Sequence, residues 1–80
     1  MAIVRMFAAA RAAAGRGRDE LPGDTVAAVL AAAERRYGAA FGEVLATCRI
    51  WVNGEAAAPS TEVGAADEVA VLPPVSGGTA

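Results

Sequence analysis

The sequence contains no histidine and no lysine, and Cys48 is its only cysteine. Without histidine, Ser–His and Cys–His dyads and imidazole acid–base catalysis are excluded. Without lysine, the chain has neither a Schiff-base amine nor a P-loop lysine. A single cysteine excludes a disulfide framework, and no metal site is expected because zinc sites draw mainly on Cys and His. The fold must therefore rest on ordinary apolar packing.

The charge balance is slightly acidic, with seven arginines against nine acidic residues and a net charge of −2. This argues against nucleic acid as a partner, because binding phosphates requires a basic surface. The chain of 80 residues is expected to form one domain. A domain of this size buries only about 60% of its unfolded surface and is marginally stable.

No targeting or membrane segment is expected. The hydrophobic run at residues 1–7 is interrupted by Arg5 and is too short for a signal-peptide core or a membrane span. The expected location is the cytoplasm, with no membrane partner. In such a reducing compartment Cys48 is interpreted as a small buried apolar side chain rather than a reactive thiol.

Apolar periodicity and turn residues predict an alternating order of elements in the first half of the chain. The expected elements are a strand at residues 2–7, a short helix at 8–14, a loop at 15–18, a strand at 19–21 and the main helix at 25–37. Asp24 or Thr25 is the expected cap of the main helix, and Gly38 its stop signal. The apolar face of that helix comprises Val26, Val29, Leu30, Ala33 and Tyr37.

The second half predicts a hairpin followed by a last strand. Residues 39–47 are expected to form an irregular connection with one helical turn. Asn53-Gly54 predicts a type I′ turn between strands at 48–52 and 55–58, because both residues tolerate positive φ. Trp51 is expected in the core rather than at an interface. After a loop at 60–66, residues 68–72 form the last strand, which two prolines terminate.

No self-contained active site is predicted. The adjacent acidic pairs, 19–20 and 67–68, would point to opposite faces of a strand, so neither forms a shared-proton dyad. They are interpreted as solvated loop and strand-edge charges. Gly15-Arg16-Gly17 lacks the third glycine of a dinucleotide-binding loop. The hydroxyl residues have no base nearby in the sequence. The protein is therefore not expected to be an enzyme.

The C-terminal segment is distinctive. Pro73 and Pro74 end the last strand and favour an extended exit. Gly77-Gly78 then offers a backbone without side chains, able to enter a narrow channel in another protein. Residues 75–78 span roughly 13 Å when fully extended. On composition alone, a frayed terminus is an alternative interpretation.

Three segments together resemble the MoaD/ThiS sulfur-carrier family, which are β-grasp relatives of ubiquitin. They are Val4-Arg5-Met6-Phe7 with the short helix after it, Val52-Asn53-Gly54-Glu55, and the run from Gly64 to Gly78 that ends in Pro-Pro-Val-Ser-Gly-Gly. The two prolines look most like the molybdopterin synthase small subunit. The resemblance implies an α+β β-grasp fold, with a mixed sheet of four to five strands on one main helix plus a short helix. It also implies a domain at 1–75 and a flexible tail at 76–80.

The resemblance further implies a carrier mechanism. A ubiquitin-activating-type adenylyltransferase would use ATP to activate the Gly78 carboxylate, and a sulfur donor would convert it to a thiocarboxylate. A sulfur-accepting synthase, the molybdopterin synthase large subunit or an analogue, would supply the active site. No cofactor would be bound by the carrier itself. The residues implied are Gly78 for covalent attachment, Gly77, Ser76, Val75, Pro74 and Pro73 for the tail, and Leu72 and Phe7 for partner docking.

The sequence departs from the family pattern at its end, where Thr79-Ala80 follows Gly78. As written, Gly78 has no free carboxylate. A protease could remove the two residues, they could be artefactual, or the protein could be a β-grasp binding module that is never thiocarboxylated. The sulfur acceptor also stays open at this point. It is molybdopterin in the favoured interpretation, and cysteine, thiamine or a secondary metabolite in the alternatives.

Overall fold

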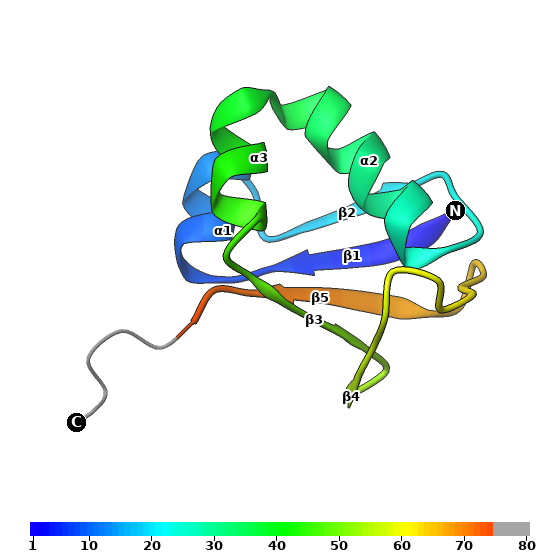
Figure 1. Cartoon of the computed structure of the whole chain (residues 1–80). Coiled ribbons are helices and arrows are strands. Elements are labelled where there is room, and N and C mark those ends of the chain that lie inside the picture. The colour runs from blue at the N-terminus through cyan, green and yellow to red at the C-terminus, as the bar shows by residue number, and fades with distance from the viewer. Residues whose placement is uncertain (75–80) are drawn as a thin grey trace.

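The computed structural model describes residues 1–74 (Figure 1). These residues form three helices and one sheet of five strands. The predictions for Val75, Ser76, Gly77 and Gly78, and the boundary between domain and tail, lie outside the described residues. Within residues 1–74 no helix is long and apolar enough to cross a membrane.

The elements follow the order expected for a β-grasp fold. They are β1 (Ala2–Met6), α1 (Ala8–Ala14), β2 (Arg18–Leu21), α2 (Val26–Tyr37), α3 (Ala39–Leu45), β3 (Arg49–Val52), β4 (Glu55–Ala56) and β5 (Glu68–Leu72). The sheet order is β2-β1-β5-β3-β4, with β5 parallel to β1 and the other pairs antiparallel. Figure 1 shows the helices gathered on one side of the sheet. The expected mixed sheet on a main helix is confirmed, with two short helices instead of one.

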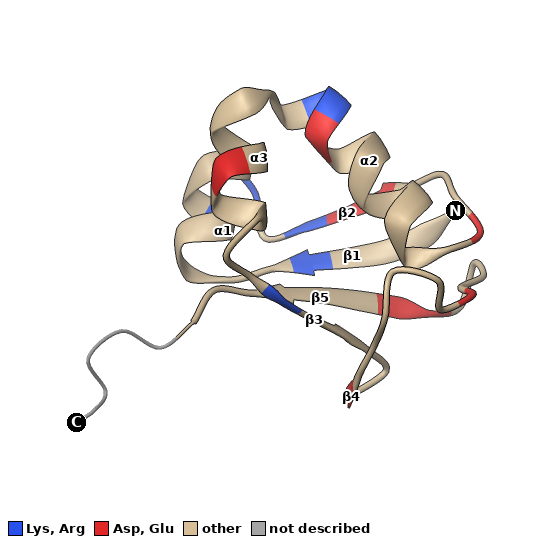
Figure 2. Ribbon diagram, viewed as in Figure 1, with Lys and Arg blue, Asp and Glu red and all other residues tan. Residues whose placement is uncertain are grey.

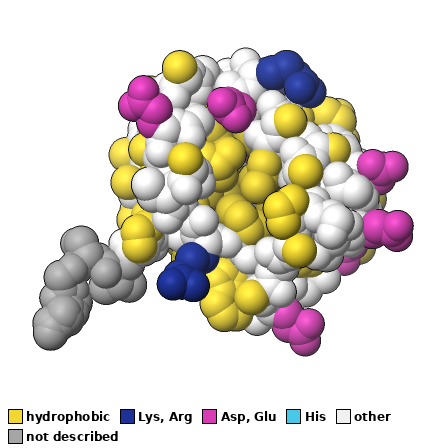
Figure 3. Space-filling view, viewed as in Figure 1, with side chains coloured by type: hydrophobic (Ala, Val, Ile, Leu, Met, Phe, Trp, Pro, Cys, Tyr) yellow, Lys and Arg dark blue, Asp and Glu magenta, His cyan; other side chains and the backbone are white. Residues whose placement is uncertain are grey.

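The core lies between the helices and one face of the sheet. Alternate residues of the two central strands face it, because successive side chains of a strand point to opposite sides. The inward-facing side chains of these strands are at most 1% exposed, as Val4, Met6, Val69 and Val71 show. Figure 3 shows apolar side chains gathered where the helices meet the front strands, with the charged groups at the periphery.

The main helix begins and ends as its sequence indicates. The Ala28 amide donates to Thr25 Oγ1 at 3.2 Å, so Thr25 is the cap rather than Asp24. This bond satisfies one of the free amides of the first turn. Val26, Val29 and Ala33 are buried as predicted, together with Ala32.

The prediction for residues 39–47 was wrong, since Ala39–Leu45 is a regular helix, α3. Phe41 on α3 is fully buried and is the largest buried side chain of the described chain. A Cβ atom at Gly42 would lie 2.5 Å from Oε2 of the exposed Glu34 side chain on α2, which would then have to shift.

The predicted hairpin is present, with a shorter return strand. Asn53 and Gly54 have φ values of 51° and 86°, the positive angles that a type I′ turn requires. The return strand β4 covers only Glu55–Ala56 rather than residues 55–58. β3 begins at Arg49, one residue later than predicted.

Candidate functional site

The base of the C-terminal segment is fixed by the central strand β5. The Phe7 amide donates to the Val71 carbonyl at 3.3 Å, and Leu72 lies opposite Arg49 of β3. Pro73 and Pro74 follow and lack the amide hydrogens that would continue the ladder. The chain therefore leaves the sheet from a strand that is paired on both sides, at the end where α1 lies (Figure 1).

An apolar depression of about 400 Å³ lies beside this exit, on the sheet face away from the helices. We call it the apolar depression; its lining residues are Phe7, Trp51, Gly54, Glu68, Ala70 and Leu72. Phe7 is 40% exposed, which is unusual for a large apolar side chain. The structure thus brings together Phe7 and Leu72, the two residues predicted to dock a partner. Docking itself stays a prediction.

Trp51 also lines the apolar depression, so its assignment to the core was wrong. Its strand neighbours Ile50 and Val52 pack against the core, and a strand directs alternate residues to opposite faces. Trp51 instead lies opposite Ala70 in register. The alternation within β3 held the signal for this placement. A large aromatic side chain on an outer face is typical of an interface residue.

The Asn53 side chain fastens the hairpin turn to the start of β5. Asn53 Nδ2 donates to Asp67 Oδ1 at 2.9 Å, and the Glu68 amide donates to Asn53 Oδ1 at 2.9 Å. The Asn53 hydrogen bond lowers the pKa of the Asp67 carboxyl, as does a bond from the Gly64 amide. These bonds hold Gly54 and Glu68, two rim residues of the apolar depression, in place.

Phe7 owes its position to an unusual backbone angle. Phe7 is extended, with φ −128° and ψ 153°, and the next residue, Ala8, has φ 51°. Positive φ is unfavourable for a residue with a Cβ atom. The turn at Ala8 sends the chain from the outer face of the sheet into α1, leaving the Phe7 ring beside the apolar depression.

Asp19 forms a cluster on the helix side of the sheet. Its carboxylate pairs with Arg36 Nε at 2.9 Å and Arg16 Nη1 at 3.6 Å and accepts from the Tyr37 hydroxyl. Partial burial acts to raise the pKa of Asp19, but its hydrogen bonds and the two arginines lower it overall. Burial and the bond to Asp19 raise the pKa of Tyr37 to about 12. Asp19 therefore joins β2 to the end of α2, and is not the freely solvated charge that the sequence indicated.

Cys48 lies half-buried at the edge of the core, as a small apolar residue would. Its Sγ donates to the Val44 carbonyl at 3.2 Å. Burial raises the pKa of the Cys48 thiol. The protonated form is thereby favoured, which argues against a nucleophilic role.

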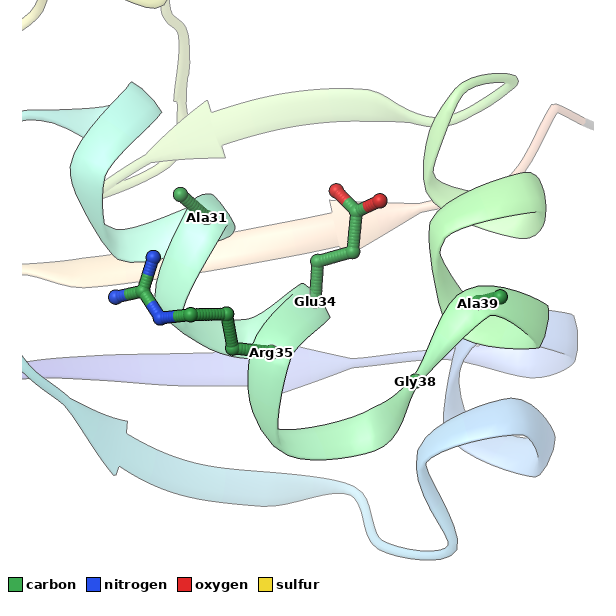
Figure 4. A pocket seen from close by; sticks show the side chains of 5 residues that line it. All are labelled: Ala31, Glu34, Arg35, Gly38 and Ala39. Carbon is green, nitrogen blue, oxygen red and sulfur yellow. The ribbon is translucent and has the colours of Figure 1, made fainter.

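A further depression of about 430 Å³ lies at the junction of α2 and α3. Figure 4 shows Glu34 and Arg35 directed away from one another there, beside the bare backbone of Gly38. In the described residues no group of three or more Cys, Asp or Glu side chains is placed to hold a metal ion. The geometry of this depression indicates no chemistry, so the apolar depression beside the β5 exit is the candidate site.

Comparison with known proteins agrees with this geometry. The model of the ThiS family matches residues 4–78. The chain belongs to the ThiS family. This confirms the resemblance to ubiquitin-like sulfur carriers, and the match reaches Gly77 and Gly78 but stops before Thr79. A search of curated proteins found no match.

Several solved structures share the fold over almost the whole of both chains. SAMP1 from Haloferax volcanii is 33% identical with a TM-score of 0.78, and the alignment covers 94% of this chain and 96% of that chain. A putative molybdopterin converting factor subunit 1 from Pyrococcus furiosus is 30% identical with a TM-score of 0.79, covering 92% and 97%. The BexX/CysO complex from Amycolatopsis orientalis gives a TM-score of 0.81 over 96% and 99%, but at 22% identity it supports the fold alone.

Proposed function

We propose that this protein is a sulfur carrier that works through the C-terminal carboxylate of Gly78. The observation that carries the proposal is the family match, which extends through Gly77-Gly78. It is supported by β5, the central strand that leads through Pro73 and Pro74 into the tail. Because Thr79-Ala80 follows in the sequence, a protease must first cleave after Gly78.

The proposed chemistry has two steps, and partner enzymes supply the active sites. An adenylyltransferase of the ubiquitin-activating type joins the Gly78 carboxylate to AMP from ATP, and pyrophosphate leaves. A sulfide-level donor then forms a C–S bond to the same carbon as AMP departs. The product is a thiocarboxylate, a stronger nucleophile than the carboxylate. The protein is in this proposal a carrier rather than a catalyst.

The apolar depression is proposed as the surface on which partners dock. Phe7, Trp51 and Leu72 offer aromatic and aliphatic contacts next to the exit of β5. A partner that covers them would receive the tail at a fixed distance from its own active site. Rigid contacts of this kind reduce the entropy cost of positioning a reactive group.

The proposed sulfur acceptor is a pterin precursor bound by a molybdopterin synthase large subunit. The Pro73-Pro74 stem supports this, as does the 30% identity to the protein from Pyrococcus furiosus whose name refers to molybdopterin. Cysteine, thiamine and secondary-metabolite pathways are the alternative destinations, because their carriers share the same tail chemistry.

A protein modifier is a second candidate, favoured by the 33% identity to SAMP1, a small archaeal modifier protein. In that case an amine of another protein would attack the Gly78 carbonyl of the acyl-adenylate, and an amide would form as AMP leaves. The two functions predict different products, since a modifier appears attached to larger proteins whereas a carrier appears as a thiocarboxylate.

Mass spectrometry of the protein purified from its native host tests the proposal. We expect a chain ending at Gly78, with a fraction heavier by about 16 Da because sulfur has replaced oxygen. Finding only chains that retain Thr79-Ala80 contradicts the carrier function. Conjugates of higher mass would favour the modifier.

Three proteins, the 1–80 chain and two truncated forms, sharpen this test in vitro. A chain of residues 1–78 should support ATP–pyrophosphate exchange by the adenylyltransferase, because its Gly78 carboxylate is free. The 1–80 chain should fail, and a chain ending at Gly77 serves as the control for tail length. Equal activity of all three would show that Gly78 is not the reactive residue.

A further inference from the structure

Three arginines gather beside the apolar depression, at the end of the sheet from which the tail departs. They line a notch of about 370 Å³ that we call the basic notch, formed by Arg5, Met6, Phe7, Arg11, Gly17 and Arg18. Phe7 lines both features, so they lie on either side of this residue. Figure 2 shows the basic segments of β1 and β2 at the α1 end of the sheet, while acidic segments gather at the opposite end.

The arrangement of these arginines is unfavourable for the isolated protein. Arg5 of β1 and Arg18 of β2 are register partners, so their side chains share one face. Like charges directly opposite one another destabilise a strand pair. Arg11 lies across the bare backbone of Gly17, where an added Cβ atom would be 3.3 Å from its Nε. Arg11 thereby adds a third positive charge to the lining of the same notch.

The protein's own carboxylates compensate only part of this charge. Arg5 pairs with Glu68 at 3.3 Å and Arg18 with Glu20 at 3.2 Å, and all four side chains are between 44% and 55% exposed. Such surface pairs are weak and exchange readily. Within residues 1–74, Arg11 forms no ion pair. The notch thus has three guanidinium groups, of which only that of Arg11 lacks a carboxylate partner in the described residues.

We propose that the basic notch receives an acidic segment of the adenylyltransferase that covers the apolar depression. This inference rests on the proposed carrier function and names the chemistry of the partner at the same surface. Arginine suits the role because its planar fork binds a carboxylate through two hydrogen bonds. The opposite charge at the far end of the sheet makes docking directional. A partner with one acidic patch is held with that patch beside the tail exit.

Association kinetics test the proposal directly. The full-length protein is mixed with the adenylyltransferase of the same organism in a stopped-flow instrument, over a range of salt concentrations. We expect Arg11→Glu to slow association about tenfold at low salt, because charge steering changes on-rates by factors of 10 to 1,000. The loss should shrink in about 1 M salt, where the Debye length is only about 3 Å.

Arg35→Glu is the matched control, since Arg35 is an exposed arginine of α2 outside the notch and the change in net charge is identical. Thermal melting verifies that both variants fold. If the two variants slow association equally, net charge alone is responsible and the proposal is overturned. Rescue of Arg11→Glu by replacing an acidic residue of the enzyme with arginine would support it.

Two further measurements separate the alternatives. Inorganic phosphate is titrated against wild type and Arg11→Gln by NMR. Phosphate binding that needs Arg11, with unchanged enzyme binding in the variant, would make the notch a small-anion site and overturn the proposal. The carrier function is scored separately, by thiocarboxylate formation on wild-type chains ending at Gly78. If Arg11→Glu associates as fast as wild type while thiocarboxylation of wild type is normal, the proposed role of the notch is refuted and the carrier function is not.

Discussion

The two faces of the sheet are built from alternating residues of the same strands, yet they differ in what covers them. On β5 the inner residues Val69 and Val71 are fully buried beneath the helices. The outer residues Ala70 and Leu72 line the apolar depression instead. A strand whose outer face met only water would carry polar side chains there. The outer face at the tail end therefore has the apolar surface that the proposed docking requires, whereas the inner face stabilises the fold.

The first prediction tests the difference between the two faces with two neighbouring residues of β5. Val71→Asp should destabilise the fold by about 3–5 kcal/mol, the cost of an uncompensated buried charge. That is a large part of the about 5–15 kcal/mol by which proteins are stable. Ala70→Asp should change stability little, because position 70 faces outward and lies opposite Arg5. Urea unfolding followed by circular dichroism measures both. Similar losses for the two variants would show that the faces do not differ.

The second prediction concerns binding rather than stability. Trp51→Ala should raise the Kd for the adenylyltransferase about 30-fold, since truncating a central aromatic anchor costs about 2 kcal/mol or more. Ile3→Ala is the control, because Ile3 is an apolar residue on the outer face of β1 that does not line the apolar depression. Calorimetric titration measures both variants. A matching loss for Ile3→Ala would contradict the assignment of docking to this surface.

Much of the inner face could be predicted from the sequence, because local signals agreed with the fold there. The spacing of Val26, Val29 and Ala33 indicated the main helix, and Asn53-Gly54 indicated the hairpin. These signals depend on residues close together in the chain. Residues 68–72 were likewise predicted as the last strand from their own alternation, but the position of β5 between β1 and β3 was not predicted.

The remaining features depend on contacts between distant residues. α3 was not predicted, because a short helix is stabilised mainly by tertiary packing, here the burial of Phe41 in the core. The Asp19 cluster joins residues from a loop, a strand and a helix. The basic notch likewise requires the pairing of β1 with β2. The role of the tail residues was inferred from the family resemblance, and of these residues 75–78 lie outside residues 1–74.

The third prediction tests the Asp19 cluster on the inner side. Asp19→Asn should cost about 1–3 kcal/mol, because it removes the charge that holds Arg36 and weakens the bond from Tyr37. Since the folded-state pKa of Asp19 is lowered, its contribution is fully present above the ordinary carboxyl value of about 4 and is lost as pH falls below it. The stability gap between wild type and variant should therefore narrow in acid.

At alkaline pH the Tyr37 contribution to folding stability changes in the opposite direction, because it is lost as pH rises. The pKa of Tyr37 is raised to about 12 in the folded protein. Its contribution is present below the ordinary tyrosine value of about 10 and is lost as pH rises toward the folded-state pKa. Unfolding curves from pH 2 to 11 measure the free energy of unfolding in both pH ranges. Asp24→Asn is the control, because it removes a carboxylate from an exposed residue. If Asp24→Asn lowers stability by the same amount and with the same pH dependence as Asp19→Asn, the Asp19 cluster is not responsible.

The smallest expected effect lies at the point where the chain passes from one face to the other. Ala8 has φ 51°, which costs an alanine about 1–2 kcal/mol relative to the right-handed region. Ala8→Gly removes that strain but adds about 0.5–1 kcal/mol of backbone entropy. The net result should be a stabilisation of about 0.5 kcal/mol. Ala9→Gly, one residue further into the regular part of α1, has only the entropy term and should destabilise.

The opposite signs of these neighbouring changes make the measurement decisive despite its small size. If Ala8→Gly destabilises as much as Ala9→Gly, the positive φ at residue 8 carries no strain. A stabilising Ala8→Gly that also weakens docking would link the two faces. Alanine would then keep Phe7 fixed on the outer side at the expense of stability on the inner side, as strained backbone does at functional sites.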